Sequence, residues 1–266
     1  MERSGQNEND LKPPRLTSQA VVRGLQALLL GGAALFFFIL SRAFPFFPSP
    51  LKVFEASAGL FFSGEIYSHL LVTLYETVAG FTIGIVLGLW IGLVLGANRY
   101  LAEVFEPIIL SAYAVPKIIF LPVLLMIFGV GISSKIANTT LHAVFPIILN
   151  TLVGIREVNR ILVKTARSLN ATQGQIFRKV YFPSMVLPVF AGMRIALGFG
   201  FLGAILAELF EAKTGLGFLV AHFYNTAQIA NMLAVILFVF VLTMSINAGM
   251  KGIENRLSHW RATWRS

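Results

Sequence analysis

The sequence predicts an all-α integral membrane protein with about six transmembrane helices and both termini on the cytoplasmic side. Its composition and the distribution of its basic residues carry this prediction. Hydrophobic residues make up 56% of the 266 residues and charged residues only 12%, with a mean hydropathy of +0.78. A soluble domain carries about 25% charged residues, so the bilayer is the natural solvent for most of this chain.

Six apolar segments are long enough to cross the roughly 30 Å hydrocarbon core of a bilayer. They are 21–41, 70–96, 104–129, 135–155, 187–210 and 229–250. Residues 21–252 are expected to form a single transmembrane domain, with cytoplasmic tails at 1–20 and 253–266. The first segment has no clear small-residue cleavage site, so we expect an uncleaved span and not a signal peptide.

Prolines interrupt two of these spans. Pro116 and Pro122 lie in the third span and Pro146 in the fourth. Membrane helices tolerate such breaks where neighbouring helices satisfy the freed backbone groups. We therefore predict that both segments cross the membrane.

The basic residues set the orientation. Fifteen of the 21 Lys and Arg residues fall in segments expected inside the cell, and Lys117 and Arg194 fall within spans. The four expected outside are Arg42, Lys52, Lys135 and Lys213. Because cytoplasmic loops carry the excess of Lys and Arg, this bias places both ends of the chain inside.

Five glycines recur at every fourth position of the second span. They are Gly80, Gly84, Gly88, Gly92 and Gly96. On a helix these positions form one stripe without side chains, which lets another helix approach closely. The stripe predicts a helix bundle.

Two long segments lie outside the membrane. The external segment, 42–69, contains the run PFFPSP and is expected to include a short helix at 51–62. The cytoplasmic segment, 156–183, is the longest inside connection apart from the tails. Its length and charge suit a contact with a cytoplasmic partner, although a solvated connector has the same features.

The cytoplasmic segment carries a spaced pattern of residues. Lys164-Thr165-Ala166 is followed after three residues by Asn170, and after nine more by Val180-Tyr181-Phe182-Pro183. This pattern resembles the EAA loop of bacterial ABC importer permeases, which reads Glu-Ala-Ala, three residues, Gly, nine residues, then Ile-x-Leu-Pro. The spacing matches in full and the identities in part, since Lys164 reverses the charge of the family's glutamate.

The resemblance implies that this loop seats in a groove of a separate ATPase subunit. Small residues permit close docking, and a left-handed residue is needed where two short helices meet. Glycine suits that position best, and asparagine is its usual substitute. The residues assigned to docking are Lys164, Thr165, Ala166, Leu169, Asn170, Ala171, Thr172, Ile176, Phe177 and Pro183.

The resemblance covers roughly residues 45–260. The segments that carry it are 48–50, 128–131, 145–154, 166–169, 191–198, 207–208 and 214–218. In this order they resemble the nitrate, sulfonate, taurine and bicarbonate branch of the binding-protein-dependent permeases.

The resemblance implies a type I ABC importer permease bundle in the bacterial inner membrane. Its implied partners are a second permease copy in a homodimer, an ATPase dimer that uses ATP and Mg, and a periplasmic solute-binding protein. This chain contains no G-x-x-x-x-G-K-[ST] phosphate loop. ATP hydrolysis is therefore expected in a separate subunit, and neither enzyme activity nor a cofactor is expected in this chain.

The implied solute is small, polar and anionic. Two alternatives remain: a permease of the same branch for a heterocyclic nutrient such as a thiamine precursor, and an ion-driven secondary transporter. The latter usually shows internal repeats, which are not evident here. A membrane enzyme would need clustered reactive groups, whereas the twelve acids are dispersed. Topology accounts for the net charge of +9, so no nucleic-acid partner is expected.

Ionisable residues inside spans are costly and are therefore functional candidates. Glu76 and Lys117 both fall about 10–12 Å below the outer face at 1.5 Å per residue, so we predict that they pair. The pair is either a structural salt bridge or, through Lys117, a group that attracts an anionic substrate. Glu208 either lines a gate or caps the external loop together with Glu211. The candidate translocation-path residues are Glu76, Lys117, Asn150 and Glu208.

Other polar residues of the spans have structural interpretations. Arg194 is expected to reach the headgroups or to pair with a loop carboxylate. His142 has no second histidine at ligand spacing, so a structural role and no metal site are expected. The remaining histidines, His69, His222 and His259, are assigned to loops or the tail. Residues 255–266 are expected to anchor the chain at the membrane interface.

Overall fold

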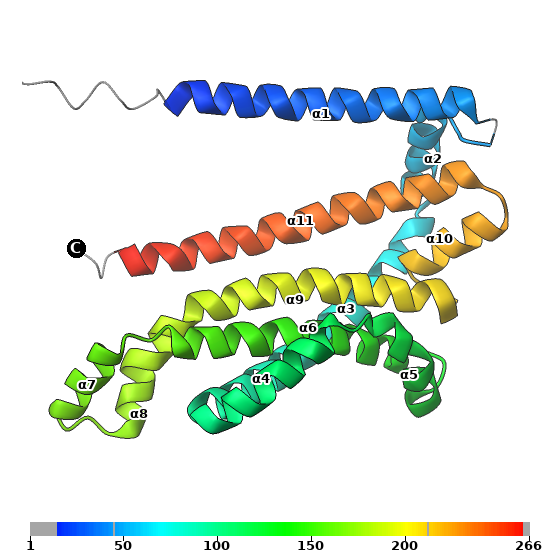
Figure 1. Ribbon diagram of the computed structural model, residues 1–266. Helices are drawn as coiled ribbons and strands as arrows, with labels where there is room; N and C mark the ends of the chain where they lie inside the picture. The colour runs from blue at the N-terminus through cyan, green and yellow to red at the C-terminus, as the bar shows by residue number, and fades with distance from the viewer. Residues whose placement is uncertain (1–14, 45, 212, 263–266) are drawn as a thin grey trace, which may run out of the picture. The chain divides into compact units, whose positions relative to one another are not determined.

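The computed structural model describes residues 15–44, 46–211 and 213–262 of the chain. Within these ranges every regular element is a helix (Figure 1). The elements are α1 (Arg15–Ala43), α2 (Pro50–Ser63), α3 (Glu65–Ala97), α4 (Arg99–Ala114), η2 (Lys117–Phe120), α5 (Leu121–Phe128), α6 (Ile132–Arg156), α7 (Arg160–Ser168), α8 (Gln173–Ile176), η3 (Phe177–Tyr181), α9 (Phe182–Glu211), α10 (Leu216–Asn225) and α11 (Ile229–Ala262). The predicted all-α fold is confirmed.

The helices fall into two units, with the boundary after Glu55. The first unit holds α1 and the start of α2. The 29 residues of α1 contain the predicted first span, and the rings of Phe37 and Phe47 meet edge to face with centroids 4.9 Å apart. The predicted short helix at 51–62 is present as α2.

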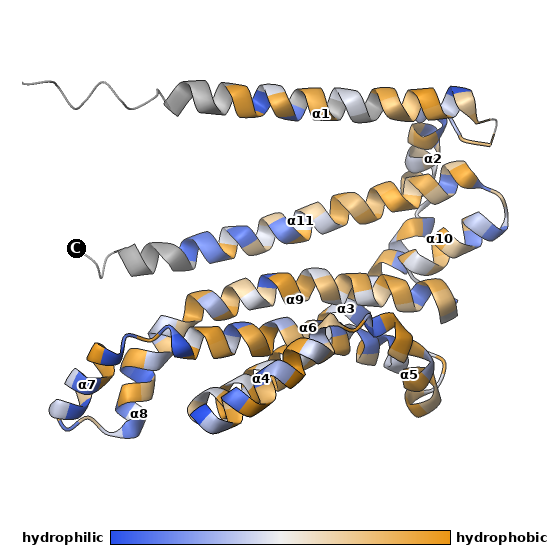
Figure 2. Ribbon diagram, viewed as in Figure 1, coloured by the Kyte–Doolittle hydropathy of each residue, from blue (hydrophilic) through white to orange (hydrophobic). Residues whose placement is uncertain are grey.

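Four helices of the second unit are long and apolar enough to cross a membrane alone, among the described residues. Helices α3, α6, α9 and α11 contain the predicted spans 70–96, 135–155, 187–210 and 229–250. Figure 2 shows apolar residues along α9 and the first half of α11, with hydrophilic residues on α7, α8 and the far part of α11. Hydropathy therefore located these spans correctly.

The third predicted span is a broken one. Helix α4 makes an angle of 87° with the segment 117–128 that follows it. Val115 has an extended backbone (φ −67°, ψ 131°), which the following proline favours, so the helix ends at Ala114. Pro122 lies in the first turn of α5, where its missing N–H leaves no carbonyl unpaired. A membrane depth estimated by counting residues along one straight helix is therefore wrong for every residue after the bend.

The glycine ladder of α3 packs against α6. A Cβ atom on any ladder glycine would lie 2.2–2.8 Å from a side-chain atom of α6. The residues opposite are Thr139, Ala143, Ile147, Thr151 and Ile155, which also recur at every fourth position. The predicted close packing of this stripe is confirmed.

Helix α6 packs equally closely on its other partner, α9. A Cβ on Gly192 would lie 2.5 Å from Cβ of Asn150, and one on Gly203 would lie 2.7 Å from Nδ1 of His142. Helix α6 is thus the central helix of a tight α3–α6–α9 group.

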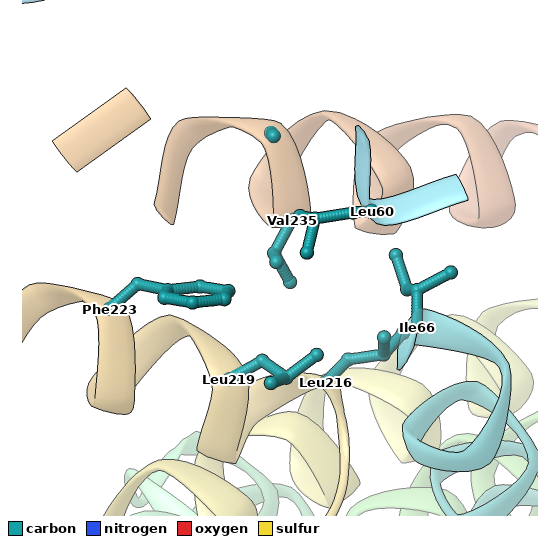
Figure 3. Packing of buried hydrophobic residues seen from close by; sticks show 7 residues of the cluster. Leu60, Ile66, Leu216, Leu219, Phe223 and Val235 are labelled. Atoms are coloured by element: carbon teal, nitrogen blue, oxygen red, sulfur yellow. The ribbon is translucent and has the colours of Figure 1, made fainter. Parts of the chain in front are cut away.

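Helix α10 is held by a separate apolar cluster (Figure 3). Its buried members are Leu60, Ile66, Leu216, Leu219, Phe223, Ala234 and Val235. They come from α2, α3, α10 and α11. This cluster fixes the body of α10, while polar groups hold its first turn.

Candidate functional site

The predicted docking loop consists of two short helices with a tight turn between them. Asn159 begins α7 by accepting the N–H of Ile161 at 2.9 Å. At the far end of α7, Asn170 adopts the left-handed conformation (φ 56°). Its N–H donates to the carbonyl of Arg167, and the N–H of Ala171 donates to that of Ala166. These are the two bonds of a Schellman motif, so the predicted left-handed conformation of Asn170 is confirmed.

Helix α8 starts immediately after this turn with a capping box. The N–H of Gln175 donates to Oγ1 of Thr172 at 3.3 Å, and the N–H of Thr172 donates to Oε1 of Gln175 at 2.9 Å. Because both ends of the turn are capped, the loop has a defined shape.

The apolar residues of the loop divide into two groups. Leu169 is 77% exposed, and Phe177 is exposed as well. Ile176, in contrast, is only 2% exposed. Ile176 therefore stabilises the loop from within, whereas Leu169 is free to contact a partner. Of the other predicted residues, Ala166 and Ala171 are half-buried, and Lys164, Thr165, Asn170, Thr172 and Pro183 are exposed.

The loop is continuous with a membrane span. Helix α8, the π-helical segment η3 and α9 follow one another without a non-helical residue from Gln173 to Phe210. Pro183 lies in the first turn of α9 and not in the loop itself. The turn and α9 are therefore joined by continuous helical backbone.

A buried ion pair lies near the outer end of the bundle. Nζ of Lys135 is 3.0 Å from Oε1 of Glu76, and the two side chains are 5% and 0% exposed. The predicted Glu76–Lys117 pair is therefore wrong. The bend after Ala114 turns Lys117 away from the assumed straight axis. The sequence predicts Lys135 in a segment outside the membrane. Helix α6 begins three residues before it, at Ile132, and Lys135 is buried inside the bundle.

Three side chains hold the first turn of α10. Thr73 donates to Oε1 of Glu208 at 2.7 Å and accepts the N–H of Leu216 at 2.9 Å. Oε2 of Glu208 accepts the N–H of Gly217 at 2.8 Å, and Nδ1 of His69 accepts that of Gly215 at 3.0 Å. These contacts are those of the capping interpretation of Glu208. The side chain of Glu211 lies outside the described residues.

Sequence reasoning missed Thr73, His69 and Lys135 as members of this polar cluster. A signal for two of them was present, because residues 69, 73 and 76 recur at spacings of four and three on one face of α3. His69 and His222 lie in α3 and α10, so their assignment to loops was wrong. His142 is a buried histidine whose Nδ1 is 2.8 Å from the carbonyl oxygen of Asn138, as expected.

Lys117 lies at the bend of the broken span. Its ammonium group donates to the carbonyls of Tyr113 and Val115, the latter at 3.2 Å. It also lies over the rings of Tyr113 and Phe145, 4.6 and 5.2 Å from their centroids. No carboxylate of the described residues lies within 4.0 Å of it, although the side chain is largely buried. Within the described part of the chain, Lys117 thus has carbonyl and ring partners but no counter-ion.

Two further predicted residues contact neighbouring helices. Asn150 is half-buried, donates to the carbonyl of Pro146 at 2.8 Å and fills the space at Gly192. Arg194 pairs with Glu254 at 2.9 Å. Because Glu254 belongs to α11, the partner of Arg194 is a helix residue and not the loop carboxylate that was expected.

Known proteins that this chain resembles are transport permeases. A putative aliphatic sulfonates transport permease of Bacillus subtilis is 30% identical over 217 residues, covering 82% of this chain and 79% of that protein. The taurine transport system permease of Escherichia coli is 27% identical, covering 81% and 80%. A formylaminopyrimidine transport permease of Halalkalibacterium halodurans is 30% identical, covering 80% and 85%.

Solved structures show the same fold. The inward-facing MetNI methionine ABC transporter matches with a TM-score of 0.65 at 23% identity, covering 72% of this chain and 95% of that chain. An amino acid ABC transporter matches with a TM-score of 0.63 at 18% identity, covering 75% and 97%.

A family model covers the part of the chain that contains the broken span, the α7–α8 loop, α9 and α10. It matches residues 84–259, well over half of the chain, and describes inner-membrane components of binding-protein-dependent transport systems. With the ABC importer permeases among its relatives and the all-helical bundle described above, this chain belongs to that family of multi-pass inner-membrane transport permeases.

Proposed function

We propose that this permease forms, with a second copy of itself, the import path for a small anion, and that a separate ATPase drives it through the α7–α8 loop. A periplasmic binding protein delivers the solute. The observation that carries the proposal is the doubly capped turn that exposes Leu169 and leads through α8 into α9 without a break in the helix.

The loop has the properties of a coupling element. Leu169 is a large apolar side chain at a turn that lies outside the predicted spans, where neither lipid nor this chain covers it. Basic residues lie near it in the sequence, at Lys164, Arg167 and Arg178. We therefore expect an apolar groove with an acidic rim on the ATPase.

Docking is tested by Leu169→Asp in a chain co-expressed with its ATPase. The ATPase is expected to co-purify with the wild type and to be lost from the variant, because a carboxylate would be desolvated in an apolar groove. Tyr100→Asp is the matched control, since Tyr100 is 81% exposed in the first turn of α4, at the same predicted face of the membrane. Equal recovery of the ATPase with Leu169→Asp and wild type would contradict docking at this turn. Ile176→Asp is unsuitable because Ile176 is buried and its loss would deform the loop.

The anionic solute is supported by Lys117 and by the relatives. A buried cation without a counter-ion attracts an anion into a low-dielectric path. Relatives are named as permeases for aliphatic sulfonates, taurine and nitrate. Asn150 is the second candidate path residue. Glu76 and Glu208 are buried, so we assign them to holding α6 and α10 in place and not to direct contact with the solute.

A heterocyclic nutrient is the second candidate, because a formylaminopyrimidine permease and the sulfonate permease are each 30% identical to this chain. Uptake of taurine, nitrate and formylaminopyrimidine is compared in proteoliposomes that contain the permease, its ATPase and its binding protein. Anion uptake that requires ATP and that Lys117→Gln reduces is expected. Uptake of the pyrimidine alone, unaffected by Lys117→Gln, would favour the second candidate. Uptake abolished by an uncoupler but independent of ATP would favour an ion-driven transporter.

A further inference from the structure

The Glu76–Lys135–Glu208 cluster has one acid too many for its bases. Glu76 and Glu208 are 0% and 1% exposed. Thr73, which donates to Glu208, is buried in α3 three residues before Glu76, so the two carboxyl groups lie at the same place in the bundle. Among the described residues, Lys135 is the only basic side chain with a nitrogen within 4.0 Å of either carboxyl group. With both acids ionised, the cluster would carry a net charge of −1 in the interior of a membrane protein, which is strongly unfavourable.

The hydrogen bonds of the two carboxyl groups differ. Both oxygens of Glu208 accept a bond, one from Thr73 and one from the N–H of Gly217. Glu208 also lies at the N-terminus of α10, where the helix dipole favours an anion. Oε1 of Glu76 accepts from Lys135, but Oε2 of Glu76 is buried and faces no donor of the described residues.

We propose that this cluster is a proton-binding site, in which one proton resides on Glu76 and is shared with the carboxylate of Glu208. Two carboxyl groups in one dry site cannot both ionise without repulsion, and a shared proton removes it. The proton supplies the missing donor between the two acids. The cluster then contains one ammonium, one carboxylate and one neutral acid, and its net charge is zero.

The position of the proton links two parts of the fold. Glu76 joins α3 to α6 through Lys135, and Glu208 joins α9 to the first turn of α10. Loss of the proton would leave two carboxylates side by side and weaken the attachment of α10. The outer end of the bundle is therefore sensitive to alkaline pH. This inference does not depend on which solute is transported.

Other ionisable groups lie around the cluster without entering it. His69 of α3 accepts the N–H of Gly215, and Glu65 and His222 are nearby charged or titratable groups. His142 of α6 has Lys117 of η2 as a nearby charged group. Among the described residues, no hydrogen bond or ion pair joins His69 or His142 to Glu76 or Glu208, so substitutions in the cluster report on its own proton.

Infrared spectroscopy of the purified full-length chain tests the proposal directly. At pH 7 exposed acids are ionised, so the carbonyl stretching band of a protonated carboxyl is expected in the wild type and absent from Glu76→Gln. The matched control is Glu254→Gln, which removes a partly exposed carboxylate paired with Arg194 and is expected to retain the band. A wild-type spectrum without the band overturns the proposal, even if Glu76→Gln fails to fold.

The pH dependence of stability is an independent test. A free glutamate loses its proton near pH 4.3, so above that pH the folded chain binds one proton more than the unfolded chain. Stability therefore falls as pH rises, by about tenfold in the folded-to-unfolded ratio per pH unit, until the cluster loses its proton.

The variant Glu76→Gln is expected to lack this slope and to exceed the wild type in stability at alkaline pH. The amide that it introduces keeps an oxygen acceptor for Lys135 and supplies an N–H donor towards Glu208, and it does not titrate. Equal slopes in the two proteins, or wild-type stability that depends on Na⁺ and not on pH, would overturn the proposal.

Discussion

Single residues set the shape of the turn between α7 and α8. Asn170 occupies a left-handed conformation that most side chains avoid, and it does so where α7 ends and the chain must reverse before α8. Thr172 and Gln175 then satisfy each other's backbone donors at the start of α8. The turn therefore depends on local hydrogen bonds, and a single substitution at any of these positions is expected to change its geometry.

Asn170→Val is expected to uncouple the permease from its ATPase. The left-handed conformation costs about 1–2 kcal/mol for an ordinary L-residue and more for a β-branched one, so the turn would open. Asn170→Gly is the control and should retain coupling, because glycine adopts this conformation freely. The measurement is ATP hydrolysis by the reconstituted complex with and without its binding protein. Full stimulation in Asn170→Val would show that the turn geometry is dispensable.

At the scale of elements, the packing of α3 on α6 depends on the absence of side chains along one stripe. The two helices approach so closely that each ladder glycine already touches the partner helix. Lipid tails are as apolar as the side chains of a membrane helix, so no hydrophobic force drives two such helices together. Dispersion contacts between closely packed helices are then a main source of attraction. The ladder is thus a specific determinant of this helix pair.

Gly84→Ala is expected to destabilise the bundle by about 1–3 kcal/mol, the usual effect of an overpacked core. Its new Cβ would lie 2.8 Å from Cβ of Ala143 on α6. Gly249→Ala in α11 is the matched control, because a Cβ there meets no atom within 4 Å and alanine favours a helix by about 0.5–1 kcal/mol. Thermal unfolding in detergent compares the two variants. A Gly84→Ala midpoint at or above that of Gly249→Ala would argue against a tight ladder contact.

At the scale of the whole molecule, orientation in the membrane follows from charge. The proposed function requires that the loop carrying Leu169 faces the cytoplasm, where an ATPase would bind, and that the segment around α2 faces outward. The distribution of Lys and Arg predicts both placements. The chain contains no cysteine, so introduced thiols report on topology without background.

Ser168→Cys and Ser63→Cys are expected to react from opposite sides of the membrane. Both residues are exposed, the first at the end of α7 and the second at the end of α2. A charged thiol reagent that does not cross lipid should label position 63 in spheroplasts and position 168 only in inside-out vesicles. Labelling of both positions from the same side would contradict the predicted topology.

The sequence by itself determined the membrane class, the four unbroken spans of the second unit, the glycine stripe and the left-handed turn at Asn170. These features depend on local composition, on helical periodicity and on hydrogen bonds between near neighbours, all of which a single chain records directly. Only the tertiary structure decided that Glu76 pairs with Lys135 and that Glu208 caps α10. Pairing across helices depends on how each helix is rotated and where it bends, and the 87° break before Lys117 is not encoded in residue counts along a straight axis.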